Sequence, residues 1–129
     1  MDDIRPLLQR ALDHAATYRE ATAAHPQPPV HDYHAMRARA AAPVPEKGSD
    51  PQAIIDDLAR LAEGGLMPMT GPRFFGWVIG SSHPTGVAAD WMVTAWGQNA
   101  GYHTPTPAVA AIEETAEGLL LDLLDPPRD

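Results

Sequence analysis

Proline placement limits how this chain can fold more than any other feature of its sequence. The 129 residues include 14 prolines, well above the average usage of about 5%. Proline has no backbone N–H and restricts the residue before it, so helices accept it mainly in their first turn. Residues 25–31 (HPQPPVH) must therefore be extended, and residues 42–51 (APVPEKGSDP) form a second such connection. These breaks favour a mainly α chain, with helices joined by proline-rich connections, over one tight core.

Between these connections, apolar residues recur at helical spacing. Ile4, Leu8 and Leu12 repeat every four residues at the start of the chain. A later helix has Ser49 or Asp50 as its N-cap, followed by a proline in the first helical position. The predicted helices cover residues 3–23, about 32–39, 50–64, about 84–96 and 107–124.

The first and last of these helices carry further expectations. The first is separated from the next strong helix by long extended connections, so it should need a partner, such as a second subunit, to cover its apolar face. The last is predicted to be capped by Thr106. Its apolar face is predicted to be buried and consists of Ile112, Ala116, Leu119, Leu120 and Leu123.

Charge and composition exclude several classes of function. The net charge is −8, which argues against nucleic-acid binding, because phosphate contacts need clustered Lys and Arg. The chain has no cysteine, so disulfides and thiolate metal sites are excluded. Neither a signal peptide nor a membrane-spanning run is visible, and a soluble, cytoplasmic protein is the default expectation.

Some polar residues have a spacing that suggests chemistry, but each has a simpler explanation. His31 and His34 could share a metal ion, yet no third ligand is evident and solvated histidines are the better interpretation. Glu113, Glu114 and Glu117 could act as acids or bases, but carboxylates near a helix start are normally solvated and favourable there. We therefore predict no metal site and no catalytic residue.

The aromatic residues are more informative, because six of the eight lie between residues 74 and 102. Trp77 stands among glycines in the irregular stretch 66–83, which makes a pocket-lining role credible. The polar, glycine-broken loop 97–103 joins two predicted helices, and such loops often carry function.

Several short motifs follow one another in the second half of the chain with family-like spacing. In order, they are Gly71-Pro72-Arg73-Phe74-Phe75, Ala89-Asp90, Gly97-Gln98-Asn99, Thr106-Pro107-Ala108 with Glu113, and the run from Leu119 to Pro127. This order resembles the N-terminal part of the group II pyridoxal-phosphate-dependent amino-acid decarboxylases, which include the aromatic amino-acid, glutamate and histidine decarboxylases. The corresponding family pattern is HP-x-F-F, Ala-Asp, an Asn-rich loop, Ser/Thr-Pro-Ala with Glu, and W-x-x-x-L-L-G-L-P. The aromatic-L-amino-acid decarboxylases are the nearest in type.

The sequence also departs from the family. Gly71 replaces the family histidine, and Asp125-Pro126 replaces Gly-Leu. In the family, a lysine in a large α/β domain holds pyridoxal phosphate as a Schiff base, and that domain lies beyond residue 129. Lys47, the chain's one lysine, lies in a proline-rich connection and cannot replace it. The resemblance therefore implies a truncated decarboxylase that is not expected to bind the cofactor or to be catalytic alone.

The resemblance further implies the leading part of a fold type I transferase architecture. Residues 1–65 would form a helical dimerisation arm, and residues 66–129 would begin the decarboxylase domain. By position, Trp77, Ile79 and Gly80 would line the amino-acid substrate pocket near the substrate side chain. Asn99 and Gly101 would reach the site of the neighbouring subunit. The expected partners are an amino-acid substrate and a second copy in a homodimer.

Two alternatives stay open. The chain could be a non-catalytic helical dimerisation or interaction module derived from the same family. It could also be an unrelated four-helix bundle, in which the first helix packs on the last.

Overall fold

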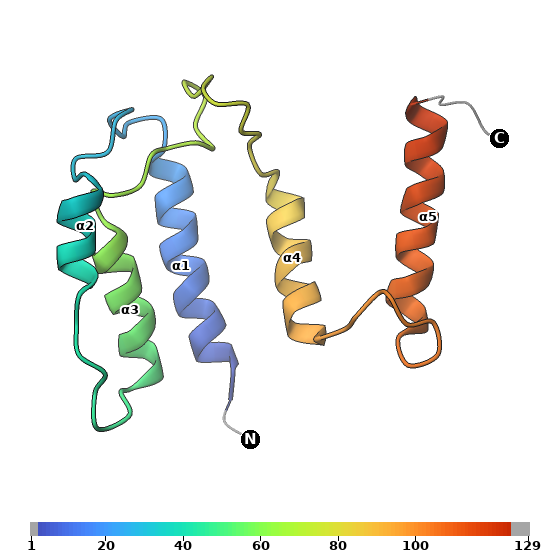
Figure 1. Ribbon diagram of the computed structural model, residues 1–129, viewed down its shortest axis with the longest axis horizontal. Helices are drawn as coiled ribbons and strands as arrows, with labels where there is room; N and C mark the ends of the chain where they lie inside the picture. The colour runs from blue at the N-terminus through green and yellow to red at the C-terminus, as the bar shows by residue number, and fades with distance from the viewer. Residues whose placement is uncertain (1–2, 125–129) are drawn as a thin grey trace. The chain divides into compact units, whose positions relative to one another are not determined.

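The computed structural model describes residues 3–124, where it contains five α-helices and no strand (Figure 1). This confirms the predicted mainly α class. The chain divides into two compact units, Met1–Ser81 and Ser82–Asp129. Residues 125–127, which end the family-like pattern, lie outside the described residues. The helices are α1 (Arg5–Ala21), α2 (Tyr33–Ala40), α3 (Pro51–Ala62), α4 (Pro84–Trp96) and α5 (Pro107–Leu124).

Local capping explains why the helices begin where they do. The Asp32 carboxylate accepts a hydrogen bond from the Ala35 N–H at 2.8 Å, and the Asp50 carboxylate accepts one from the Ala53 N–H at 2.9 Å. Asp50 rather than Ser49 is therefore the cap of α3, followed by a proline at the first position. These side chains satisfy N–H groups that have no partner within the helix.

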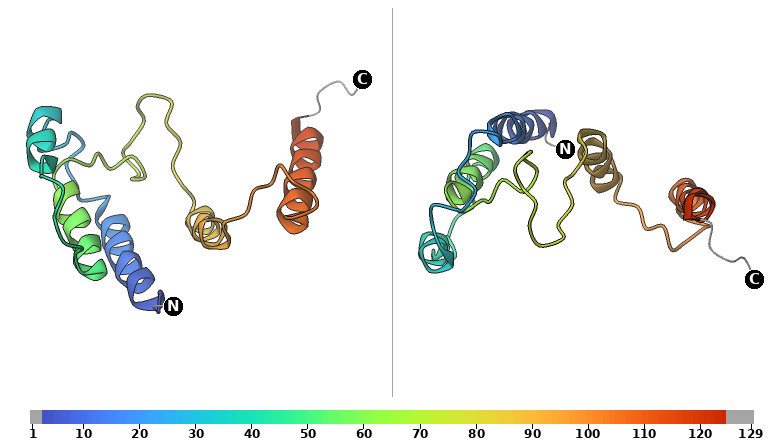
Figure 2. Two further views of the ribbon diagram at one scale, coloured as in Figure 1. Left: turned by 60° about the horizontal axis from the view of Figure 1, so that its bottom comes forward. Right: turned by 90° about the horizontal axis from the view of Figure 1, so that it is seen from above.

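Within the first unit, α3 lies between α1 and α2 and packs against both (Figure 2). The proline-rich connections thus let α1 reach α3, a packing partner that the sequence did not indicate. The other side of α1 still exposes Ile4, Leu8 and Leu12, which are 57%, 42% and 47% accessible.

A small core lies where residues 22–31 meet residues 63–73. Pro68 is fully buried, and Thr22 is buried as well. The Tyr18 hydroxyl donates to the Met67 carbonyl at 3.2 Å, and the His31 N–H donates to the Gly64 carbonyl at 2.9 Å. These contacts hold the end of α1 and the following connection against the chain that follows α3. The segment 71–80 therefore begins beside a packed part of the first unit.

The second unit contains α4 and α5, and its apolar residues are largely accessible. The predicted burial of the α5 face is wrong. Ile112, Leu119, Leu120 and Leu123 are 57–81% exposed, Ala116 is exposed as well, and only Ala110 of this helix is buried. The reason is that, within the second unit, α4 does not pack against α5. Despite its apolar sequence, neither α5 nor any other helix between residues 3 and 124 could span a membrane.

Candidate functional site

Residues 71–74 attach the candidate pocket segment to the first unit. The Gly71 N–H donates to the Pro68 carbonyl at 2.9 Å. The Arg73 guanidinium donates to the Ala23 and His25 carbonyls at 2.9 and 2.7 Å. The Arg73 side chain is thus committed to the backbone that follows α1 and anchors the segment there.

Little room is left for a side chain at Gly71. A Cβ built at this position would lie 3.1 Å from the Pro68 carbonyl oxygen and 3.3 Å from the Thr22 carbonyl oxygen. Both atoms belong to backbone that the small core holds in place, so they cannot move as a flexible side chain could. The local packing therefore favours glycine at position 71.

Beyond this anchor the chain forms an exposed apolar tip, residues 75–79 (Phe-Gly-Trp-Val-Ile). Phe75 is 92% exposed, Trp77 is 77% exposed and Val78 is completely exposed. Ile79, at 43%, is the least accessible of the large side chains in the tip. Apolar groups of this size are more often covered in a folded protein, so the tip is an unusually exposed apolar surface.

The backbone of the tip is strained. Trp77 and Val78 both have left-handed conformations, with φ angles of 62° and 54°. Such angles are rare for any residue other than glycine and are outliers for a β-branched residue such as valine. Each costs on the order of 1–3 kcal/mol, and strain of this kind clusters at ligand-binding sites. Trp77 is thus both strained and exposed, and the pocket-lining role of its side chain stays a prediction.

Gly80 behaves differently from Gly71. A Cβ added at Gly80 would meet nothing within 4 Å. Trp77, Ile79 and Gly80 therefore follow one another in one exposed, irregular segment of the first unit. No close approach of other atoms requires glycine at position 80.

Asn99 and Gly101 belong to the second unit, in the loop between α4 and α5. The Asn99 side-chain oxygen accepts a hydrogen bond from the Gly101 N–H at 2.9 Å, which closes a tight turn. The Thr106 hydroxyl lies within hydrogen-bond distance of the Asn99 and Tyr102 carbonyl oxygens, and its single O–H can donate to either, which fastens the loop to the start of α5. This loop is ordered by its own side chains, and both predicted site residues are exposed on it.

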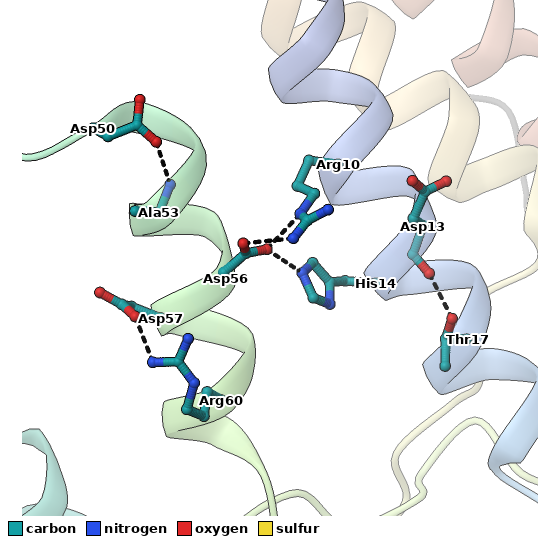
Figure 3. A network of polar contacts seen from close by, with 9 residues as sticks. All are labelled: Arg10, Asp13, His14, Thr17, Asp50, Ala53, Asp56, Asp57 and Arg60. Atoms are coloured by element: carbon teal, nitrogen blue, oxygen red, sulfur yellow. Dashed lines mark hydrogen bonds and ion pairs between the residues drawn. The ribbon is translucent and has the colours of Figure 1, made fainter.

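The sequence did not predict a polar cluster that lies between α1 and α3 (Figure 3). Asp56 of α3 accepts hydrogen bonds from Arg10 Nε at 2.5 Å and Arg10 Nη2 at 2.6 Å, and its Oδ1 lies 2.7 Å from His14 Nε2. The hydrogen bonds from Arg10, and then from His14, hold the pKa of the Asp56 carboxyl well below its usual range. A carboxylate held ionised by two partners is a poor general base, so the cluster joins two helices and is not suited to catalysis.

The same cluster borders a groove of about 1040 Å³ between α1 and α3. Its lining includes small side chains from both helices, among them Ala11, Ala15, Ala59 and Ala62. The spacing of Arg10 and His14 places them on one side of α1, which was visible in the sequence. Their partner lies 42 to 46 residues away, and no local pattern identifies it.

The described residues do not fit a site for pyridoxal phosphate. A Schiff base needs a lysine held in a pocket, and Lys47 lies exposed in the connection between α2 and α3. Among residues 3–124, no three His, Asp or Glu side chains are grouped so that they could hold a metal ion. His31 packs over Gly64, whereas His34 stacks edge-on with Tyr33. Glu113, Glu114 and Glu117 lie exposed on α5.

Comparison with known proteins gives no assignment: no family model, no curated protein and no solved structure matches the chain. The resemblance to the decarboxylases therefore rests on the sequence motifs alone.

Proposed function

We propose that this chain supplies the N-terminal segment of a group II pyridoxal-phosphate-dependent amino-acid decarboxylase. In that role it contributes dimer contacts and part of the substrate pocket, and it is not catalytic alone. The observation that carries the proposal is the strained, exposed tip 75–79, held on a fixed base by Gly71 and Arg73. In the proposed enzyme, the apolar side chains of this tip would form one wall of the substrate pocket.

The cofactor, when bound in such an enzyme, supplies the electron sink that decarboxylation of an amino acid requires. The residues of this chain would have a different task. Trp77 and Ile79 would contact the substrate side chain and exclude water from it. Asn99 and Gly101 would extend toward the site of the neighbouring subunit, as the family pattern implies.

The exposed stripe on α1 supports the dimer contact. Ile4, Leu8 and Leu12 follow one another on successive turns and are each about half exposed. On α3, Ile54 and Leu58 are 52% and 62% exposed. A second copy of the chain would cover these side chains, and burial of apolar area is the main favourable term in such association.

A trans-complementation assay tests this proposal. The acceptor is the pyridoxal-phosphate-loaded catalytic domain of an aromatic amino-acid decarboxylase from which the N-terminal segment has been excised. That domain's own segment, added back, is the positive control. We expect this chain to raise CO2 release, and Trp77→Ala to lower the gain while Trp96→Phe leaves it intact. If the native segment restores activity but this chain does not, the proposed function is wrong.

The exposed apolar side chains of α1 and α3 also favour a second candidate function, a non-catalytic dimerisation module. In that case the chain would form a dimer but would leave the acceptor domain inactive. A pyridoxal phosphate Schiff-base absorbance band retained by the chain alone would contradict both candidates.

A further inference from the structure

We infer that the exposed face of α5 binds a basic amphipathic helix of a partner polypeptide. This inference goes beyond the proposed function and concerns the second unit alone. It rests on three properties of α5: an accessible apolar face, a hollow on that face that fits a side chain of a second helix, and charges that are all acidic.

The apolar side chains of α5 lie on one side of the helix and reach solvent. Ile112, Leu119 and Leu123 follow one another at intervals of seven and four residues, which places them on one face. Each is more than half exposed, and α4 does not pack on this face within the second unit. The helix is 18 residues long, or about 27 Å at the usual rise per residue, which is enough for several turns of a partner helix.

A hollow on this face has the pattern that accepts a side chain from a second helix. It is lined by Ile112, Thr115, Ala116 and Leu119, together with Ala111. The first four stand at positions i, i+3, i+4 and i+7, the set that forms a hole for one side chain in coiled-coil packing. The Thr115 hydroxyl donates to the Ala111 carbonyl at 2.8 Å, so its O–H is satisfied within α5. The hollow therefore suits an apolar side chain carried by a helix.

The charges of the second unit indicate which kind of helix fits. Between residues 82 and 124 the carboxylates are Asp90, Glu113, Glu114, Glu117 and Asp122, and there is no lysine or arginine. A second copy of α5 would bring like charges together, which opposes binding. A helix with lysine or arginine beside its apolar stripe would instead be attracted to this surface. Helices that lie on membrane surfaces typically carry basic residues on their polar face, so the acidic α5 is also poorly suited to lipid.

Fluorescence anisotropy with the whole chain tests this inference. The probe is a labelled synthetic peptide as long as α5, with leucine at the a and d positions of a heptad and lysine at the e and g positions. The control peptide has glutamate in place of each lysine. We expect the lysine peptide to bind about tenfold or more tightly than the glutamate peptide. The difference should shrink at high salt, because salt screens exposed charges.

Two pairs of variants locate the binding surface. Leu119→Gln changes no charge and should weaken binding of the lysine peptide about tenfold, because it removes an apolar side chain from the contact. Val44→Gln, at an exposed position between α2 and α3, is its control and should bind normally. Glu113→Lys, next to the apolar face, should weaken binding more than Glu114→Lys, which lies about 200° around the helix from Ile112. Circular dichroism checks that each variant keeps its helical content.

Four outcomes would overturn the inference. The first is equal affinity for the two peptides, and the second is an equal loss in Glu113→Lys and Glu114→Lys. The third is a wild-type dimer that Leu119→Gln dissociates, which would show that a second copy covers this face. The fourth is binding to phosphatidylcholine vesicles that Leu119→Gln abolishes, which would show that the face lies on a membrane.

Discussion

Asp56 shows how one side chain can determine whether two helices stay together. It lies on α3 and binds both Arg10 and His14 of α1, so three polar contacts across the helix pair depend on it. Asp57, the next residue, pairs only with Arg60 of its own helix at 2.6 Å. The two neighbours therefore form a matched pair, one linking helices and one not.

We expect Asp56→Asn to lower the urea midpoint of unfolding clearly, because the amide keeps the size but loses the charge that attracts Arg10. Asp57→Asn should change it little, since exposed pairs within one helix contribute weakly. Urea denaturation followed by circular dichroism measures both. Equal midpoints for the two variants would show that Asp56 does not hold α1 on α3.

The same residue predicts a pH dependence. The pKa of Asp56 is lowered in the folded chain, so its contribution to stability is complete above its ordinary pKa near 3.8 and is lost as pH falls toward the folded value. The stability difference between the wild type and Asp56→Asn should thus be constant near neutral pH and shrink as pH drops below about 4. Urea midpoints of both proteins between pH 7 and pH 3 provide the test. A difference that grows with acidification would refute the assignment.

Gly71 and Gly80 form a second matched pair. We expect Gly71→Ala to cost about 1–3 kcal/mol, the range for overpacking, since its Cβ would press on two backbone carbonyl oxygens. Gly80→Ala should be near neutral, because its Cβ would meet open space. The free energies of unfolding of the two variants measure this contrast. A neutral Gly71→Ala would mean that the 68–71 turn relaxes without cost.

At the scale of elements, the sequence predicted the helices well because their limits are set locally. The prolines of residues 25–31 exclude a helix there. The carboxylates of Asp32 and Asp50 cap α2 and α3 by accepting hydrogen bonds from backbone N–H groups three residues later. Each helix lies within about two residues of its prediction. Packing was less predictable, because the α1–α3 contact joins residues more than 40 apart and no sequence period encodes it.

The N-cap of α3 can be tested by substituting its two candidate residues. Asp50→Ala should destabilise the first unit by about 1 kcal/mol, the typical loss of an N-cap, whereas Ser49→Ala should leave it unchanged. The reason is that only the Asp50 carboxylate accepts the Ala53 N–H. Thermal unfolding of the two variants distinguishes them, and an equal loss at Ser49 would show that the cap is shared.

For the whole molecule, the sequence predicted a candidate site segment, and the structure adds a conformation of that segment that the sequence did not predict. The glycines around Trp77 favoured a pocket-lining role for it, and the family resemblance implied the same for Ile79 by position. Both residues lie on an exposed tip. The left-handed backbone of Trp77 and Val78 was not foreseeable, because neither residue type favours it. The α5 face was wrongly expected to be buried, since helical spacing shows which side is apolar but not what covers it.

The exposed stripe on α1 (Ile4, Leu8 and Leu12) is the part of the proposed homodimer contact that can be tested by substitution. Sedimentation equilibrium should show a dimer for the wild-type chain and a monomer for Leu8→Glu/Leu12→Glu. Val44→Glu is the matched control, because Val44 is also exposed, at 92%, but lies in the connection between α2 and α3; it should remain a dimer. A wild-type chain that stays monomeric at all concentrations, or a stripe variant that dimerises as well as the control, would contradict a dimer contact through α1.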